Sequence, residues 1–243
     1  MPLKNFFLRY VKRDSVLYRV VSRFRRKSLV SFFLTPFFLV PYTIYLTKVA
    51  TGSFYPIRFV YKGRFIPVKI SRAKTGKIKI QDKVVLESWG YGNDIVSITI
   101  GDDAALNIDG EFTLGQGCLL VATAGAIINI KGKLNSTASG ITCNTRIMAE
   151  QSIEIGYDCI IAWGCFISDS NWHELSGSER CRPVTIGNLV WIGHDVSVLS
   201  GAKIGDGCVV GAKSLVLGKE YQPFNLLAGN PARVVRENIT WSR

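Results

Sequence analysis

Aliphatic side chains recur at every sixth position along the C-terminal half of this chain. The repeat has no break over residues 186–216, where Ile186, Ile192, Val198, Ile204, Val210 and Val216 share one phase and Val190, Val196, Ala202, Cys208 and Ser214 share another. An α-helix turns once in 3.6 residues and a strand alternates every two, so neither gives a period of six. A period of six is typical of a parallel β-helix, in which stacked coils bury shared columns of side chains. The pattern therefore predicts an all-β solenoid.

The same spacing continues upstream with slips of register. It is found over residues 100–112, 141–147 and 155–167. The largest interruption follows Ile167, because the next position of the column, Ile186, comes nineteen residues later. We expect a loop to leave the stack there, and long loops on a rigid scaffold commonly carry function.

A different pattern precedes the repeats. Residues 28–47 contain no charged residue, a length that could span a bilayer, but Pro36 and Pro41 interrupt the stretch. Three interpretations remain open: an anchor at the membrane interface, helices packed on their own protein, and a true membrane span. Short alternating runs between residues 55 and 80 predict strands. The expected domains are an N-terminal extension (1–76, helical and then stranded), a β-helix (77–222) and a short C-terminal arm (223–243).

Charge is divided unevenly along the chain. Residues 1–79 contain 18 lysines and arginines and a single acid, Asp14, whereas residues 80–243 contain 12 basic and 17 acidic residues. This excess of cations indicates an anionic partner. The cations flank an apolar stretch instead of alternating with aromatics along a groove, which favours an anionic membrane surface, contacted through residues 1–50, over nucleic acid.

The cysteines bear on the cellular location. Cys159, Cys165 and Cys208 occupy the small-residue phase of the repeat, where a free thiol packs as a small apolar group. Free thiols are typical of reducing compartments. We therefore expect a cytoplasmic protein, with peripheral attachment to the inner face of the cell membrane as a further possibility.

Three segments, in this order, resemble the left-handed β-helix acyltransferases. They are Asp169-Ser-Asn-Trp-His173, Ile186-Gly-Asn-Leu-Val-Trp-Ile-Gly193 and Ala228-Gly-Asn-Pro-Ala-Arg-Val-Val-Arg236. The likeness covers residues 95–240 and is to the sugar O-acetyltransferases of the maltose and galactoside type. The Asp-x-x-x-His segment looks most like enzymes that modify bacterial surface polysaccharides. The resemblance implies left-handed coils, a homotrimer with each active site between two subunits, acetyl-CoA as co-substrate and no metal.

Acetyl transfer to a hydroxyl needs a base, donors for the developing oxyanion, and a site that holds both substrates. The chain has two histidines, and His173 stands in the predicted loop where the family keeps its catalytic histidine. We expect His173 to be the general base. Asp169 could accept the other ring N–H and fix the tautomer, or it could cap the loop.

The resemblance assigns two positions to the acceptor. Asn144 corresponds to an asparagine that contacts the acceptor in related enzymes, although an asparagine at a β-helix corner is equally ordinary. Trp172 could form a wall under a sugar ring or pin the loop.

Further positions are assigned to CoA. The backbone N–H at His194 is expected near the thioester, and small residues are expected to line the pantetheine groove. Cations are expected at the phosphates, because guanidinium groups pair well with phosphate oxygens. The predicted CoA-binding residues are Trp191, His194, Ala212, Ser214, Lys219, Arg233 and Arg236.

Other functions remain open. An N-acetyltransferase of a nucleotide-linked amino sugar would use the same donor and base. A non-catalytic scaffold at the membrane would use neither. A carbonic anhydrase on the same fold needs three histidine ligands for zinc, which two histidines do not supply. The loop and the basic N-terminal part favour an O-acetyltransferase that acts on a sugar hydroxyl of a bacterial surface polysaccharide, or of its lipid-linked precursor.

Overall fold

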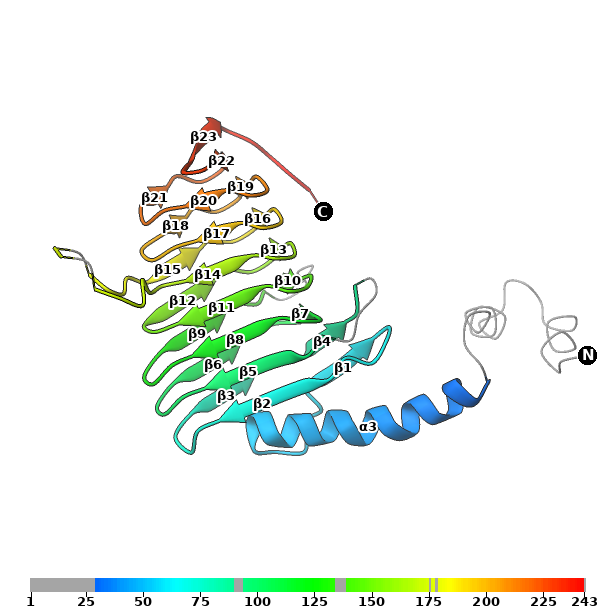
Figure 1. Ribbon diagram of the computed structural model, residues 1–243. Helices are drawn as coiled ribbons and strands as arrows, with labels where there is room; N and C mark the ends of the chain where they lie inside the picture. Colours follow the sequence, from blue (N-terminus) through cyan, green and yellow to red (C-terminus); the bar gives the residue numbers. More distant parts are fainter. Residues whose placement is uncertain (1–28, 90–93, 134–138, 175, 178, 243) are drawn as a thin grey trace, which may run out of the picture. The chain divides into compact units, whose positions relative to one another are not determined.

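A computed structural model of the chain describes residues 29–89, 94–133, 139–174, 176–177 and 179–242 (Figure 1). The chain divides into two units, Met1–Tyr42 and Thr43–Arg243. Helix α3 (Leu29–Thr51) contains both prolines of the uncharged stretch. No helix in the described part of the chain combines the length and the apolar character needed to cross a bilayer. The cations at residues 23–27 lie outside the described residues.

The last turns of α3 belong to the second unit and pack within it. Thr43, Leu46, Thr47 and Ala50 are buried at the spacing of one helix face. The Thr47 Oγ1 atom accepts a hydrogen bond from the backbone N–H of Arg58 (3.0 Å). Residues 43–51 are therefore a helix packed on its own protein, as one of the three interpretations expects.

From β1 to β22 every third strand belongs to the same sheet, so the chain winds through three sheets in turn. Sheet A contains β1 (Phe59–Lys62), β4 (Val84–Glu87), β7 (Phe112–Gly115), β10 (Ser139–Ile141), β13 (Ile160–Ile161), β16 (Trp191–Ile192), β19 (Val209–Val210), β22 (Leu226–Gly229) and β23 (Ala232–Arg236). Sheet B contains β2 (Val68–Arg72), β5 (Val96–Ile100), β8 (Leu119–Ala122), β11 (Arg146–Ala149), β14 (Phe166–Ser168), β17 (Ser197–Val198) and β20 (Leu215–Val216). Sheet C contains β3 (Lys77–Ile80), β6 (Ala105–Ile108), β9 (Ile127–Ile130), β12 (Ser152–Ile155), β15 (Val184–Ile186), β18 (Lys203–Ile204) and β21 (Glu220–Tyr221).

Stacked apolar columns explain the period of six. In sheet A the register places Ile141, Ile161, Ile192, Val210 and Leu227 beside one another in successive coils. Each of these side chains is almost fully buried. Because Ile192 pairs with Val210, one regular coil takes eighteen residues, or three repeats. The predicted parallel β-helix is confirmed.

Glycine near each corner allows the coils to stack closely. A Cβ atom on Gly193 would lie 2.7 Å from the backbone nitrogen of Ala212 in the next coil, and one on Gly187 would lie 2.8 Å from that of Asp206. Neither contact is possible for a real side chain. The left-handed backbone of the corner falls on a later residue, such as Asp195 (φ 55°) or Lys213 (φ 61°).

The stack is longer than the predicted domain at its N-terminal end. β1 pairs with β4 and β2 pairs with β5, both in parallel. The first coil therefore begins at Phe59, ahead of the expected start at residue 77. At the other end β22 pairs in parallel with β19, and β23 folds back antiparallel on β22.

Candidate active site

The chain leaves the stack between β14 and β15, at the corner that joins sheet B to sheet C (Figure 1). The excursion is a hairpin, because Ser170 and Cys181 form an antiparallel bridge and the Asn171 N–H donates to the Arg180 carbonyl (2.9 Å). His173 is exposed and lies beyond this paired segment. The predicted loop is thus present, and its two arms are paired where it leaves the stack.

Asp169 holds the start of the hairpin. Its carboxylate is fully buried and accepts three backbone N–H groups, from Glu150 (2.8 Å), Gln151 (2.8 Å) and Ser152 (2.6 Å). These donors form the corner between β11 and β12, one coil below. No hydrogen bond joins Asp169 to the His173 ring among the described residues. The contacts therefore give Asp169 the capping role that the sequence left open, rather than the role of orienting His173.

Glu150 braces the two arms of the hairpin. It accepts hydrogen bonds from Ser170 Oγ (2.5 Å), from Arg180 Nη2 (2.5 Å) and Nε (3.1 Å), and from Cys181 Sγ (3.1 Å). Burial opposes ionisation of this carboxylate, but the hydrogen bonds from Ser170, Arg180 and Cys181 outweigh it, so the pKa of Glu150 lies below its ordinary value. The ionised carboxylate therefore stabilises the hairpin.

Arg182 fixes the returning arm to the coil above. Its backbone N–H contacts Ser200 Oγ (3.0 Å), and its guanidinium Nη2 donates to the Ser200 carbonyl (3.0 Å). Contacts to Glu150 below and Ser200 above leave only the outer part of the hairpin unsupported. His173 is therefore presented from a base held by both neighbouring coils.

Trp172 has an unusual backbone. Its φ is 61°, a region that bulky side chains rarely adopt, and its N–H donates to Ser170 Oγ (2.9 Å). Its side chain is 36% exposed. A bulky residue held in such a conformation is commonly found at functional sites, and here it directly precedes His173.

The corners between sheet A and sheet B carry a second set of predicted residues. Asn144 is exposed at the corner between β10 and β11, with φ 50°, which asparagine tolerates well. His194 lies at the corner between β16 and β17. Its Nδ1 atom is 3.1 Å from Asp195 Oδ2, and its ring stacks on Trp163 (centroids 5.0 Å apart, planes at 5°).

Trp163 was not among the predicted site residues. It occupies the corner one coil below His194, because β13 pairs with β16. Its side chain is 51% exposed although it is large and apolar. We call Trp163, His194 and Asp195 the aromatic corner.

Two residues predicted to line the pantetheine groove differ in accessibility. Ala212 is exposed at the corner above His194. The Ser214 side chain is buried, and its hydroxyl donates to the Gly211 carbonyl (2.6 Å) and accepts the Gly229 N–H (3.1 Å). The Ser214 hydroxyl is thus used inside the corner, and only backbone groups there could meet a ligand.

The other residues predicted to bind CoA lie elsewhere on the surface. Trp191 begins β16 and contacts Trp241 (centroids 6.0 Å), while Lys219 lies at a corner between sheets B and C, with its ammonium 4.9 Å from the Tyr221 ring. Arg233 and Arg236 are exposed on β23. The B–C corner with His173 and the A–B corners with Asn144 and His194 are separated by sheet B. The predicted site residues therefore lie on different edges of one chain.

The cysteines are free thiols. Burial raises the pKa of the Cys118 thiol to about 12 and that of Cys165 to about 11, which makes both poor nucleophiles. Cys159, Cys165 and Cys208 are buried, as their phase in the repeat predicts. Within the described ranges, no three His, Cys, Asp or Glu side chains gather to hold a metal ion.

Comparison with known proteins gives the family. Residues 183–218 match the family described as bacterial transferase hexapeptide (six repeats). The chain is 31% identical over 152 residues to WbbJ of Escherichia coli (strain K12), a protein named for lipopolysaccharide biosynthesis O-acetyl transfer. The aligned region covers 57% of this chain and 74% of that protein. The chain is 39% identical over 99 residues to the galactoside O-acetyltransferase of the same organism, which covers 39% of this chain and 48% of that enzyme. Among solved structures, the polysialic acid O-acetyltransferase OatWY is 25% identical with a TM-score of 0.48, over 76% of this chain and 91% of that one.

The repeated coils and these similarities identify a hexapeptide-repeat transferase. The chain belongs to this family of bacterial transferases, and it is an acyltransferase. The predicted fold class, a left-handed parallel β-helix with an N-terminal helical extension, and the predicted enzyme class are thereby confirmed.

Proposed function

We propose that this protein is an acetyl-CoA-dependent O-acetyltransferase that acts on a sugar hydroxyl of a bacterial surface polysaccharide or its precursor. The observation that carries the proposal is the exposed His173, presented from a hairpin that is hydrogen-bonded to the coils above and below. A hairpin anchored in this way keeps the His173 imidazole near one edge of the β-helix while leaving it open to two substrates. The names of the two Escherichia coli relatives support a hydroxyl acceptor on a glycan.

In the proposed reaction His173 acts as general base. Its neutral imidazole takes the proton of the sugar hydroxyl as the oxygen attacks the thioester carbonyl. A C–O bond forms, the C–S bond breaks, and the proton passes to the departing CoA sulfur. Backbone N–H groups at the A–B corner near His194 would stabilise the oxyanion.

The separation of the residues supports a homotrimer. We propose that the B–C corner of one subunit faces the A–B corner of the next, as in a ring with threefold symmetry. His173 of one subunit would then meet Asn144 and His194 of its neighbour. Asp169 would serve this site as a positioning residue, and Trp172 would lie beside the acceptor.

The donor is proposed to lie along the upper coils. Trp191, Ala212 and the backbone at Ser214 would line the pantetheine groove, and Lys219, Arg233 and Arg236 would contact the phosphates of CoA. No metal is needed for this transfer, because the imidazole supplies the base and the corner supplies the donors.

The proposed location is the cytoplasm, at the inner face of the cell membrane. The six free thiols support a reducing compartment. The cation excess of the N-terminal part supports association of residues 1–50 with an anionic membrane surface.

A two-acceptor assay tests the proposal. Purified protein is incubated with acetyl-CoA and either an oligosaccharide or a nucleotide-linked amino sugar, and the free thiol of CoA is measured. Thiol release that requires the oligosaccharide supports the O-acetyltransferase. Release only with the amino sugar would show an N-acetyltransferase, and absence of CoA binding would favour a scaffold.

A further inference from the structure

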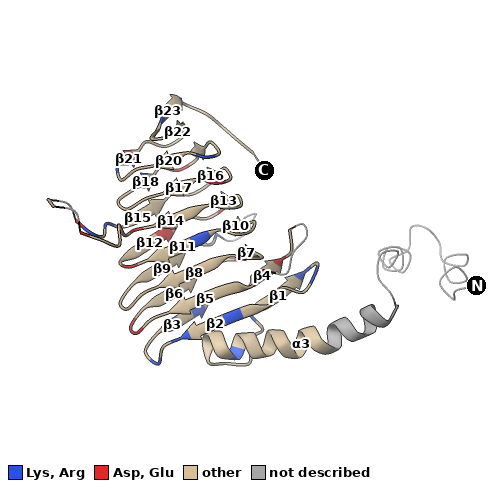
Figure 2. Ribbon diagram, in the orientation of Figure 1, with Lys and Arg blue, Asp and Glu red and all other residues tan. Residues whose placement is uncertain are grey.

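The N-terminal end of the β-helix is strongly basic, and the first acid after its cations is Asp82. Between residues 43 and 81 there are nine lysines and arginines and no aspartate or glutamate. In Figure 2 the basic positions fall on β2, β3 and the adjoining loops, whereas acidic positions lie on later coils. We call residues 48–79, which contain these cations, the basic end.

Three lysines of the basic end have no acidic neighbour in the register of the sheets. In the register of the sheets, exposed lysines stand beside uncharged residues of the second coil: Lys69 beside Ser97, Lys77 beside Ala105 and Lys79 beside Asn107. Later coils are different, since Lys131 forms an ion pair with Glu154 (2.5 Å). Within the basic end Lys62 pairs with Glu87 (2.7 Å) and remains 69% exposed at its side chain. An uncompensated cluster of this kind attracts an anionic surface.

Exposed apolar side chains accompany the cations. Phe54 is 59% exposed and Tyr55 is 81% exposed, in the loop between α3 and β1. The Lys48 ammonium lies 4.8 Å from the Phe54 ring centre. Aromatic rings next to lysines suit the headgroup level of a bilayer, where rings enter the apolar boundary and ammonium groups remain in water.

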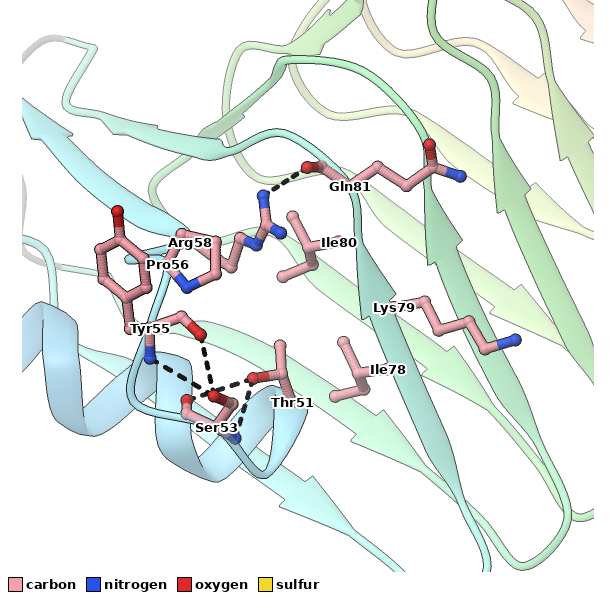
Figure 3. Close-up of a pocket in the computed structure, with 9 residues that line it drawn as sticks. All are labelled: Thr51, Ser53, Tyr55, Pro56, Arg58, Ile78, Lys79, Ile80 and Gln81. Carbon is pink, nitrogen blue, oxygen red and sulfur yellow. Dashed lines mark hydrogen bonds between the residues drawn. The ribbon is translucent and has the colours of Figure 1, made fainter.

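The loop is held in place beside a hollow. The Arg58 guanidinium donates to the backbone carbonyls of Gln81 and Asp82 (2.9 Å to the latter), which ties the loop to the end of β3. An open pocket of about 340 Å³ is lined by residues of this loop and of β3. Figure 3 shows the Tyr55 ring directed away from the isoleucines of β3. The aromatic side chains are therefore displayed by an anchored loop.

We propose that the basic end is a binding surface for an anionic phospholipid bilayer. Lys69, Lys77 and Lys79 meet the headgroups, and Phe54 and Tyr55 enter the boundary between headgroups and acyl chains. This surface belongs to the first coil and its leading loop, so it acts in addition to residues 1–42. It requires no acetyl transfer, and it extends the proposed membrane contact of residues 1–50 to the first coil.

Vesicle binding by the full chain tests the proposal. Vesicles of phosphatidylcholine alone are compared with vesicles that also contain phosphatidylserine, by co-sedimentation. The variant K69Q/K77Q/K79Q is expected to bind the anionic vesicles about 100-fold more weakly, because each lysine near such a surface contributes about fivefold in affinity. A charge-matched control, K131Q/K133Q/K203Q on later coils, is expected to stay within about threefold of the unmodified chain.

The apolar contribution is tested separately. The variant F54S/Y55S keeps every cation and is expected to lose the part of the binding that survives high salt, because salt screens only the electrostatic part. Circular dichroism and thermal unfolding show whether each variant folds.

The outcomes separate this proposal from its competitors. Equal losses in both triple variants, or unchanged binding in the basic-end variant, overturn it. Loss of single-stranded oligonucleotide binding with unchanged vesicle binding would assign the surface to nucleic acid instead. Acetyl transfer to a water-soluble acceptor, measured on the same samples, is expected to be unchanged, so failure of lipid binding and failure of the enzyme proposal give different results.

Discussion

On one side of β14 the chain leaves sheet B through a buried carboxylate, and on the other side it enters sheet B from a corner whose large rings are exposed. The Asp169 carboxylate accepts hydrogen bonds from the backbone of a neighbouring coil. Trp163 and His194 stack on each other, with Trp163 about half exposed and the His194 side chain 35% exposed. The B–C corner is thus built to hold a projecting loop still, whereas the A–B corner offers an open surface. A two-substrate site needs both properties, and the proposed trimer would bring them together.

The largest effect is expected for His173. His173→Gln removes the proposed base while keeping a polar side chain of similar size, so turnover of the sugar acceptor should fall by about 10² or more. The measurement is kcat from thiol release, with the KM for acetyl-CoA close to that of the unmodified chain. Full turnover in this variant would show that His173 is not the general base and that the B–C corner takes no part in the reaction.

Asp169 is expected to act through the position of the hairpin. Asp169→Ala leaves three backbone N–H groups without their acceptor, which should destabilise the fold by about 2–4 kcal/mol. Asp169→Asn keeps the shape and one acceptor oxygen, so its loss should be smaller. Chemical denaturation measures whether the loss of folding stability is larger in the alanine variant than in the asparagine variant. If Asp169 instead oriented the His173 ring, both variants would shift the pH profile of kcat without this loss of stability.

Substitutions in the aromatic corner are expected to change the KM for the sugar acceptor more than kcat. If the exposed Trp163 ring supports a sugar ring, Trp163→Ala should raise the acceptor KM by about tenfold, since aromatic contacts contribute about 0.5–1.5 kcal/mol beyond area burial. Trp163→Phe should recover most of the affinity. Mass measurement of the native assembly shows whether the alanine variant remains oligomeric. A lost oligomer, with unchanged acceptor KM per assembled site, would make Trp163 a subunit contact.

The same contrast explains what the sequence could and could not predict. The unbroken spacing over residues 186–216 predicts the regular coils, because each repeat there has one structural phase. Trp163 was missed because its neighbour His194 lies across the excursion, so the spacing does not reveal that they stack. The sequence left the role of Asp169 open between capping the loop and orienting His173, because its hydrogen-bond donors come from the previous coil.

The N-terminal boundary shows a similar limit. β1 and β2 lack the hexapeptide spacing, yet they pair in register with β4 and β5. Phe59 and Ile66 are almost fully buried at this end. The end coil has a neighbouring coil on one side only, so its buried residues need not follow the column that repeats elsewhere.

The smallest effect concerns the charge of Glu150. Its pKa is lowered in the folded chain, because hydrogen bonds from Ser170, Arg180 and Cys181 outweigh its burial. A lowered pKa means that the contribution to stability is present above the unfolded-state value, near 4.5, and is lost as the pH falls through the folded-state value. The hairpin should therefore loosen in acid while the rest of the β-helix keeps its structure.

Hydrogen exchange of the hairpin amides in the unmodified chain and in Glu150→Gln measures this effect. The ratio of the two exchange rates at each pH cancels the intrinsic pH dependence of exchange. At neutral pH the ratio should be large, because the variant lacks the charge that Arg180 binds in two places. In acid the ratio should fall towards one, as the unmodified carboxyl becomes protonated. Arg180→Gln provides the matched control, since it removes the charged partner and should reduce the same pH dependence. A ratio that stays constant across this range would show that the neutral hydrogen bonds from Ser170 and Cys181, rather than the ionised carboxylate, hold the two arms of the hairpin together.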